Sequence, residues 1–266
     1  MHRLTQIIRS EGPKPRLGSR EYQIRCVPIG SDGIVYFLIV DLSDPTRAVT
    51  ATLDGPVLAV LAQAGKPLTA GEVAAQTPRG SEIGVRRSLT RLTEQGIVRA
   101  TEMGRNRVHE LNRDHLAAPV AVTLSGLRLE LWKRLRSTLS GWNPKPAYAC
   151  VFGSAARGDG DSDSDIDLLL VHAPLPGESE RRRRSGGMEP VAALAAELMA
   201  VQLTERQAAK WRRQVDELRG LVRDWTGNPL QALELSTFQW ADHRRQASTL
   251  FEEITRDGIE LTGAGR

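Results

Sequence analysis

Residues 152–171 read FGSAARGDGDSDSDIDLLLV, a dense acidic loop followed at once by an apolar run. Five of the nine positions from Asp159 to Asp167 are aspartates, and the chain then continues as LLLV. A solvated surface loop would explain the first three of these aspartates. It does not explain Asp165 and Asp167, which lie where a buried strand is expected to begin.

Asp165 and Asp167 are separated by two positions in the expected strand 165–172. Side chains at this spacing share one face of a strand, while Ile166 points to the other face. Two adjacent carboxylates repel each other unless a cation lies between them. Mg²⁺ accepts one or two protein carboxylates together with phosphate and water oxygens. The pair is therefore a predicted metal site, and Asp165 and Asp167 are its predicted catalytic residues.

Two other acidic or phosphate-binding motifs are excluded by their spacing. An EF-hand loop needs Gly at position 6 and Glu at position 12, and neither Asp159 nor Asp161 starts such a loop. The GxxxxGK[ST] pattern of a P-loop does not occur in this stretch.

Gly153 and Ser154 follow the expected buried strand 147–152 and precede a short helical turn. Glycine allows a phosphate to approach the backbone, and a hydroxyl with helix N-terminal amides can bind it. Arg157 follows within the same turn and has two interpretations, neutralising phosphate charge or holding the loop. Gly153, Ser154 and Arg157 are therefore the predicted nucleotide-binding residues.

The pattern formed by these residues resembles the minimal nucleotidyltransferase domains of the DNA polymerase β superfamily, which carry GS-x-x-RG followed by SDIDL. The signature positions in this chain are Gly153, Ser154, Arg157, Gly158, Ser164, Asp165, Ile166, Asp167 and Leu168. The resemblance implies transfer of a nucleoside monophosphate from a nucleoside triphosphate, two Mg²⁺ ions, and a third carboxylate on a later strand.

Glu234 is the candidate for that third carboxylate, as a metal ligand or proton acceptor. It alternates with leucines in the expected strand LQALELS (230–236). An acidic side chain between apolar neighbours is unusual unless it faces a site. The alternative is that Glu234 lies on an exposed strand face.

Residues 52–112 contain signals for three helices and a β-hairpin. Asp54 and Ser81 are expected N-caps, and Thr69 with Glu72 forms a capping box. Val85, Leu89 and Leu92 recur at helical spacing in the third helix, and two alternating runs follow around residues 103–106. This order is that of a winged helix-turn-helix, and LTRLTEQGIV with a basic hairpin resembles MarR-like domains.

The third helix and the hairpin tip of this segment are basic. Between Arg79 and Arg107 there are seven Arg and three Glu. Basic residues of a helix-turn-helix bind phosphates while its recognition helix enters the major groove. The sequence therefore predicts binding of double-stranded DNA, with a solvated face or a protein–protein module as alternatives. The predicted DNA-binding residues are Arg86, Arg87, Arg91, Arg105 and Arg107.

The expected fold class is α+β: a winged helix-turn-helix followed by a polymerase-β-like nucleotidyltransferase domain, whose small mixed sheet is flanked by helices. The expected parts are an unassigned N-terminal β-rich segment (1–50), the winged helix (51–118), a linking helix (119–145), the nucleotidyltransferase domain (146–236) and a C-terminal helix and tail (237–266). Residues 143–146, Asn-Pro-Lys-Pro, suggest the boundary before the catalytic domain.

The composition limits which class of protein this is and in which cellular compartment it is expected. Of the 266 residues, 40% are hydrophobic and 26% charged, with a formal net charge of +4. Two cysteines without CxxC spacing argue against a structural zinc site and favour a reducing cytoplasm. No apolar run is long enough to span a bilayer, so we expect a cytoplasmic protein without a membrane partner.

Three functions remain open from the sequence. The first is a Mg²⁺-dependent nucleotidyltransferase with a winged-helix DNA-binding module. The second is a transcription regulator whose nucleotidyltransferase domain only senses nucleotide. The third is a toxin–antitoxin component that modifies a partner protein or tRNA, as the resemblance implies. A homodimer is compatible with each of them.

Overall fold

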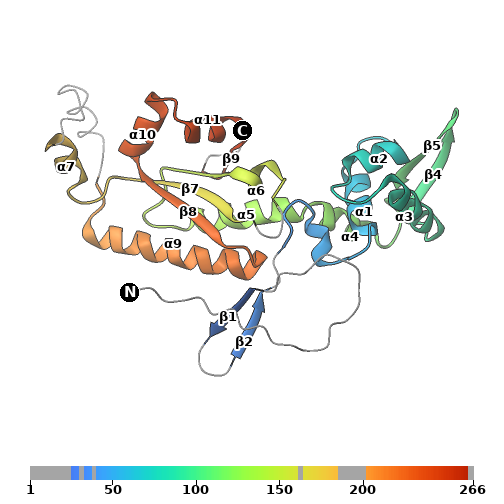
Figure 1. Cartoon of the computed structure of the whole chain (residues 1–266), viewed down its shortest axis with the longest axis horizontal. Coiled ribbons are helices and arrows are strands. Elements are labelled where there is room, and N and C mark those ends of the chain that lie inside the picture. The colour runs from blue at the N-terminus through green and yellow to red at the C-terminus, as the bar shows by residue number, and fades with distance from the viewer. Residues whose placement is uncertain (1–24, 30–32, 38–39, 161–163, 185–201, 263–266) are drawn as a thin grey trace. The chain divides into compact units, whose positions relative to one another are not determined.

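The computed structural model describes residues 25–29, 33–37, 40–160, 164–184 and 202–262 (Figure 1). The chain divides into two compact units, residues 1–38 and residues 39–266. In the first unit, strands β1 (Arg25–Ile29) and β2 (Gly33–Phe37) pair in antiparallel register. Over the residues described, this pairing agrees with the β-rich N-terminal segment expected from the sequence.

The second unit begins with three helices and a hairpin, which we call the helix–hairpin module (residues 52–112). Its elements are α1 (Asp54–Gln63), β3 (Leu68–Thr69), α2 (Ala70–Gln76), α3 (Glu82–Glu94), β4 (Val98–Met103) and β5 (Asn106–Leu111). The strand order is β3-β5-β4, with antiparallel pairing throughout. This element order agrees with the one predicted from the sequence.

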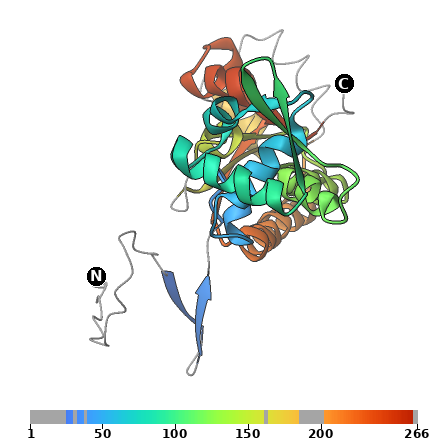
Figure 2. The same ribbon diagram turned by 90° about the vertical axis from the view of Figure 1, so that its right-hand side faces the viewer.

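Two of the three predicted N-caps form, at Thr69 and Ser81, whereas Asp54 is the first residue of α1, whose N-cap is Leu53 without a side-chain cap bond. The Thr69 side chain accepts a hydrogen bond from the Glu72 backbone while the Glu72 carboxylate accepts from the Thr69 backbone, which completes the capping box of α2. Ser81 caps α3 through the Gly84 amide. α3 and the hairpin β4–β5 pack against each other (Figure 2). The core of the helix–hairpin module includes Val57, Leu61, Val73, Val85, Leu89 and Leu111.

The remainder of the second unit is built on a four-stranded mixed sheet of order β8-β7-β6-β9. Its strands are β6 (Tyr148–Phe152), β7 (Ile166–His172), β8 (Leu230–Ser236) and β9 (Ile259–Glu260). β7 and β8 run parallel, whereas β6 is antiparallel to both β7 and β9. The first three strands were predicted, but β9 was not.

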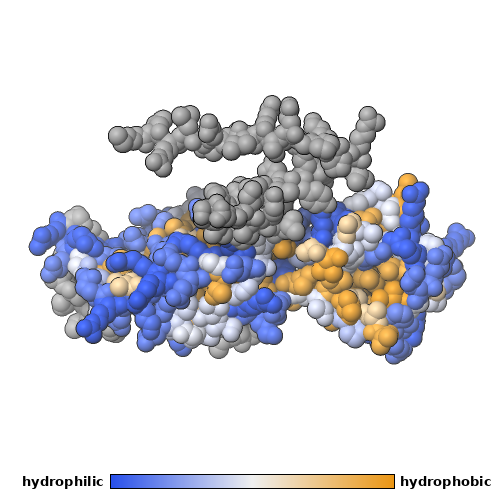
Figure 3. Space-filling model, turned by 90° about the horizontal axis from the view of Figure 1, so that it is seen from below, coloured by the Kyte–Doolittle hydropathy of each residue, from blue (hydrophilic) through white to orange (hydrophobic). Residues whose placement is uncertain are grey.

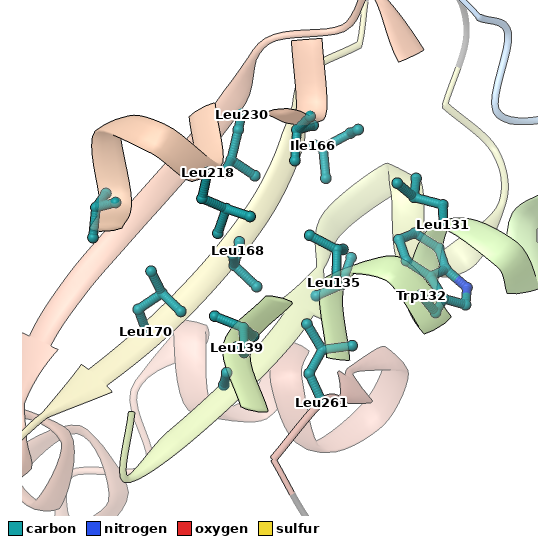
Figure 4. Close-up of a cluster of buried hydrophobic side chains, with 14 of the residues drawn as sticks. Leu131, Trp132, Leu135, Leu139, Ile166, Leu168, Leu170, Leu218, Leu230 and Leu261 are labelled. Atoms are coloured by element: carbon teal, nitrogen blue, oxygen red, sulfur yellow. The ribbon is translucent and has the colours of Figure 1, made fainter. Parts of the chain in front are cut away.

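Helices cover both faces of this sheet (Figure 1). α5 (Leu127–Ser140) and α9 (Glu205–Thr226) bury their apolar stripes against one face, in the cluster drawn in Figure 4. The opposite face carries Cys150, Leu169 and Val171, which pack with residues of α10 (Thr237–Arg245) and α11 (Thr249–Asp257). Burial on both faces explains why β7 is an apolar run.

Three predicted domain boundaries are wrong. The expected linking helix is two helices, α4 (Ala118–Ser125) and α5, and Leu131, Leu135 and Leu139 of α5 belong to the core of the sheet. Leu42, expected in the N-terminal segment, is buried in that same core, next to the short 3₁₀ helix η1 (Pro45–Ala48). At the other end, α11 and β9 complete the sheet layer and are not a tail.

The short helix α7 (Glu178–Arg184) follows β7 along the chain.

The surface is mostly hydrophilic, with apolar residues gathered over the helix–hairpin end of the face in Figure 3. Large hydrophobic side chains exposed on or beside α4 include Leu116, Val120 and Val122. Among the described residues, no helix combines the length and apolar character that a membrane span requires.

Candidate functional site

The carboxylates of Asp165 and Asp167 lie at the start of β7. Asp167 pairs in register with Phe152 of β6 and Gln231 of β8. Ile166, Leu168 and Leu170 are fully buried in the cluster with α5 and α9, so alternation places Asp167 on the other face of the sheet. Asp165 is exposed and Asp167 half-buried, and neither side chain has a hydrogen bond or ion pair with any other described residue.

The electrostatic environment of Asp167 favours a bound cation. Burial raises the pKa of its carboxyl, and the negative charges of Asp165 and Glu253 raise it further. Arg157 opposes this effect but only as the smallest contribution. A carboxylate that is destabilised by its neighbours gains most from a cation placed beside it.

Gly153 allows Asp167 to sit against the backbone of the preceding turn. Gly153 begins the short helix α6 (Gly153–Arg157) with φ of +69°, in the left-handed region that favours glycine. A Cβ at this position would overlap the Oδ2 atom of Asp167. The structure therefore brings together the predicted phosphate turn and the predicted metal ligand, and it gives a physical reason for the glycine.

Ser154 is available to a ligand in the same turn. Its backbone carbonyl accepts the amides of Gly158 and Asp159, at 2.9 and 3.2 Å. Its hydroxyl has no hydrogen-bond partner among the residues that the structure describes. The hydroxyl is thus free to donate to an incoming oxygen.

Arg157 is held by two carboxylates in this structure. Its Nε donates to Asp159 at 3.0 Å, and its Nη1 donates to Glu253 of α11 at 3.2 Å. This arrangement supports the loop-holding interpretation of Arg157. The sequence offered no signal for Glu253, because it lies 96 positions from Arg157 and is brought there only by the packing of α11 on α6.

Glu234 does not join the carboxylate pair, and its prediction as the third catalytic acid and metal ligand is corrected. It pairs in register with Leu170, so it shares the face of β8 that is turned toward α9. There the indole N–H of Trp211 donates to Glu234 Oε2 at 2.8 Å, and Arg219 lies 3.5 Å from Oε1. Glu234 therefore interacts with side chains of α9 and not with the carboxylate pair.

Gln231 is the residue of β8 that lies beside Asp167. It is exposed, and it shares the sheet face of Asp167 because paired residues of parallel strands point the same way. The strand position next to the predicted metal ligand thus carries a neutral amide.

Asn228 positions the chain that enters β7, and sequence reasoning missed it. Its Nδ2 donates to the carbonyl of Ser164 at 3.1 Å, directly before Asp165. The adjacent amide of Ile166 donates to the Pro229 carbonyl at 3.0 Å. Asn228 is fully buried, so these bonds tie the start of β8 to the residues that flank the carboxylates.

The residues present fit a Mg²⁺ ion held by Asp165 and Asp167. The donor set is two carboxylates without an ion pair among the described residues, and hard oxygen ligands of this kind suit Mg²⁺ with added phosphate and water oxygens. Over the described ranges, no group of three or more His, Cys, Asp or Glu side chains is placed to hold a metal ion.

Three of the five predicted DNA-binding arginines line one concavity. Arg86, Arg105 and Arg107 line a concavity of about 630 Å³ between α3 and the hairpin, together with Thr90 and His109. Arg87 and Arg91 do not line it. Arg91 is bonded to the carboxylate of Asp54, which also accepts from Ser88.

Comparison with known proteins finds a family match over the sheet region. The family of nucleotidyltransferase domains matches residues 130–245. No curated protein matches the chain. Among solved structures, human N-acetylserotonin methyltransferase in complex with SAM matches with 18% identity and a TM-score of 0.24, over 36% of this chain and 30% of that one. The match is too weak to support an argument about fold or function. Residues 130–245 are thus similar to nucleotidyltransferase domains.

Proposed function

We propose that the protein is a Mg²⁺-dependent nucleotidyltransferase that transfers a nucleoside monophosphate from a nucleoside triphosphate to an acceptor hydroxyl. The observation that supports this most strongly is the carboxylate pair Asp165 and Asp167, which has no ion pair among the described residues and whose Asp167 lies against Gly153. The resemblance of the turn and strand motifs, and the family match, support the same reaction class.

The reaction replaces a phosphoanhydride bond by a phosphoester bond. The acceptor oxygen forms a bond to the α-phosphorus, the bond to the β-phosphate oxygen breaks, and pyrophosphate leaves while the hydroxyl proton is released. Mg²⁺, held by Asp165 and Asp167, supplies charge neutralisation for the triphosphate when bound. The Ser154 hydroxyl and the open backbone at Gly153 bind and orient phosphate oxygens.

A labelling experiment tests this function directly. We expect the purified protein, incubated with Mg²⁺, cell extract and each α-labelled nucleoside triphosphate in turn, to transfer label to a macromolecule or small acceptor. Chelation of the metal should stop the transfer. Because the acceptor classes implied by the sequence resemblance are protein and tRNA, protease and nuclease treatment of the product separates them. Nucleotide binding without transfer in any extract would contradict the proposal.

Asp167→Asn should raise the thermal stability of the metal-free protein. The pKa of Asp167 is raised in the folded state, so ionisation at neutral pH costs stability, and that cost disappears as the pH falls through the folded pKa. Because the carboxyl is only half-buried, the gain is small, about 1–3 °C in Tm. Calorimetry with and without Mg²⁺ measures it.

Mg²⁺ provides the control for this substitution. Saturating Mg²⁺ should raise the Tm of the wild type and leave that of Asp167→Asn nearly unchanged, since only a state that binds the ion is stabilised by it. If Mg²⁺ raised the Tm of the wild type and of Asp167→Asn equally, the ion would bind at a site that does not include Asp167.

The helix–hairpin module is proposed to be a winged helix-turn-helix that binds double-stranded DNA. The element order α1-β3-α2-α3-β4-β5, the exposed arginines of α3 and the basic hairpin tip support this proposal. Arg87 is exposed, and neither it nor Arg105 and Arg107 has an ion pair among the described residues. Cations without partners are available to phosphates.

Arg105→Ala combined with Arg107→Ala should weaken duplex binding and flatten its salt dependence. Each lost phosphate contact reduces the slope of log K against log salt by about 0.9, so the pair should remove up to about two units. Gel shifts at several salt concentrations measure the slope. Arg212→Ala with Arg213→Ala removes the same charge from the exposed side of α9 and should leave the slope unchanged. No retardation of any duplex at roughly 50 mM salt would contradict DNA binding.

A second function, nucleotide sensing without transfer, is favoured by two observations. The β8 residue beside Asp167 is Gln231 rather than an acid, and Arg157 is engaged by Asp159 and Glu253. A sensor would bind nucleoside triphosphate with Mg²⁺ and change its DNA affinity without releasing pyrophosphate. Pyrophosphate release measured beside DNA binding distinguishes the two functions.

A further inference from the structure

The residues that precede the helix–hairpin module, 40–51, form a connecting segment that is bonded to the sheet region. The Val40 amide donates to the carbonyl of Thr226 at the end of α9, at 2.8 Å. Within the segment, Asp41 accepts from the Ser43 amide at 3.0 Å and from the Ser43 hydroxyl at 2.6 Å. The first residues of the connecting segment are thereby fixed relative to the sheet.

The connecting segment also supports the loop that follows the short helix α6. The Ser43 amide donates to the Gly160 carbonyl at 3.0 Å. A Cβ added at Gly160 would lie 2.9 Å from the Ser154 hydroxyl oxygen, so the Gly160 backbone lies against the predicted phosphate-binding hydroxyl. The space available to that hydroxyl therefore depends on Ser43, a residue from a distant part of the chain.

Arg128 of α5 supports the same loop from a second element. Its Nε and Nη2 atoms donate to the Leu42 carbonyl at 3.2 and 2.8 Å. A Cβ added at Gly158 would overlap the Nη1 atom of Arg128, and Gly158 has a φ of +78°, in the region that favours glycine. Arg128 thus packs against the loop while it holds the connecting segment.

A buried ion pair anchors the connecting segment to the helix–hairpin module. Asp44 is 2% exposed, and its carboxylate accepts from the Nε of Arg79 and from the Thr46 hydroxyl. Arg79 lies between α2 and α3 of the module, and its Nη2 also donates to the Thr52 carbonyl at 2.9 Å. Because an unpaired charge in the interior is costly, the buried Asp44 depends on this cation. Arg79 therefore fixes Asp44 and the adjacent Ser43.

We propose that Arg79 and Asp44 are positioning residues of the nucleotide site. Their ion pair fixes Ser43, the Ser43 amide holds Gly160, and Gly160 keeps the Ser154 hydroxyl in place for a phosphate oxygen. This role rests on the proposed nucleotide binding at the Gly153–Ser154 turn. It extends that proposal, because nucleotide affinity then depends on an arginine of the helix–hairpin module.

Arg79→Gln should weaken the binding of a nucleoside triphosphate with Mg²⁺ to the full-length protein. The substitution leaves the Asp44 carboxylate buried without its cation, so the connecting segment moves and the support of Gly160 is lost. We expect the Kd to rise about tenfold, as for the loss of one hydrogen bond to a charged group. Isothermal titration calorimetry with ATP, GTP, CTP and UTP in turn measures the Kd and the number of sites. A lower number of sites at an unchanged Kd would indicate partial unfolding alone and overturn the proposal.

Arg99→Gln is the matched control, because it removes the same charge from β4 of the same module. Arg99 forms an exposed ion pair with Asp114, so its loss should leave the Kd within about twofold of wild type. Arg79→Lys keeps a cation beside Asp44 and should restore most of the lost affinity. If Arg79→Gln bound nucleotide as tightly as Arg99→Gln, the positioning role would be wrong.

Hydrogen exchange of the nucleotide-free protein separates failure of this role from failure of the proposed function. The amides of Gly158 and Asp159, which donate to the Ser154 carbonyl, should exchange faster in Arg79→Gln than in Arg99→Gln. Faster exchange in a protein that binds none of the four nucleotides would support the positioning role and contradict the proposed function. Unchanged exchange would overturn the role at any nucleotide affinity.

Arg128→Gln provides the test if Arg79→Gln does not fold. It removes the two bonds to the Leu42 carbonyl without leaving a buried carboxylate unpaired. The Kd and the exchange of the Gly158 and Asp159 amides should both rise, and if neither changed, the connecting segment would not support the loop and the proposal would fail.

Discussion

Replacement of both Asp165 and Asp167 by Asn is expected to lower nucleotidyl transfer by at least about 10³-fold. The two carboxylates are the proposed metal ligands, Asp167 lies against Gly153, and loss of metal binding removes several kcal/mol of charge stabilisation. The fold should survive, since the substitution relieves repulsion within the pair. Transfer of α-labelled nucleotide, with circular dichroism as the folding check, measures the effect.

Glu234→Gln is the matched control for this substitution. It neutralises an acid in the same sheet but on the opposite face, where an amide oxygen can still accept the Trp211 indole N–H. We expect its turnover to stay within about threefold of wild type, well short of the roughly 10²-fold loss of a general acid–base group. If Glu234→Gln lost most of its transfer activity while the variant with Asp165→Asn and Asp167→Asn stayed active, the active site would lie on the face of the sheet that carries Glu234.

Gly153→Ala is expected to have the second-largest effect, about 10²-fold or more on transfer. Its φ of +69° is strained for alanine, and the added Cβ would displace the carboxylate of Asp167. A small misplacement of a reacting group costs about this much in rate. The free energy of unfolding should fall by about 1–3 kcal/mol, as is typical of strained backbone positions. Denaturant titration and the labelling assay measure both changes.

Gly220→Ala controls for the loss of a glycine in the same domain. Gly220 lies within α9, and a Cβ added there has no neighbour within 4 Å. In a helix interior this substitution should stabilise the protein by up to about 1 kcal/mol and leave transfer unchanged. If Gly153→Ala were as well tolerated as Gly220→Ala, the close approach of Asp167 to the turn would not be required for function.

Several features of the protein could be read from short stretches of sequence because local physics decides them. Thr69 with Glu72 and Ser81 cap their helices as expected, since an N-cap needs only the next three residues. The alternation of Asp165, Ile166 and Asp167 around β7 follows from the two-residue period of a strand. The strands of the sheet that the motif predicts, β6 and β7, begin or end within one residue of the expected positions.

The tertiary structure decided which of these elements meet. From the sequence, Glu234 was predicted to be an acid of the site because it alternates with leucines. Both faces of β8 are covered, however, and its register with Leu170 places its side chain on the face toward α9. Glu253 reaches Arg157 only through the packing of α11 on α6. Likewise α5 and β9, distant from the motif in sequence, complete its core and its sheet. Periodicity determines which residues share a face of a helix or strand. The element that packs on that face depends on long-range packing, which no local pattern encodes.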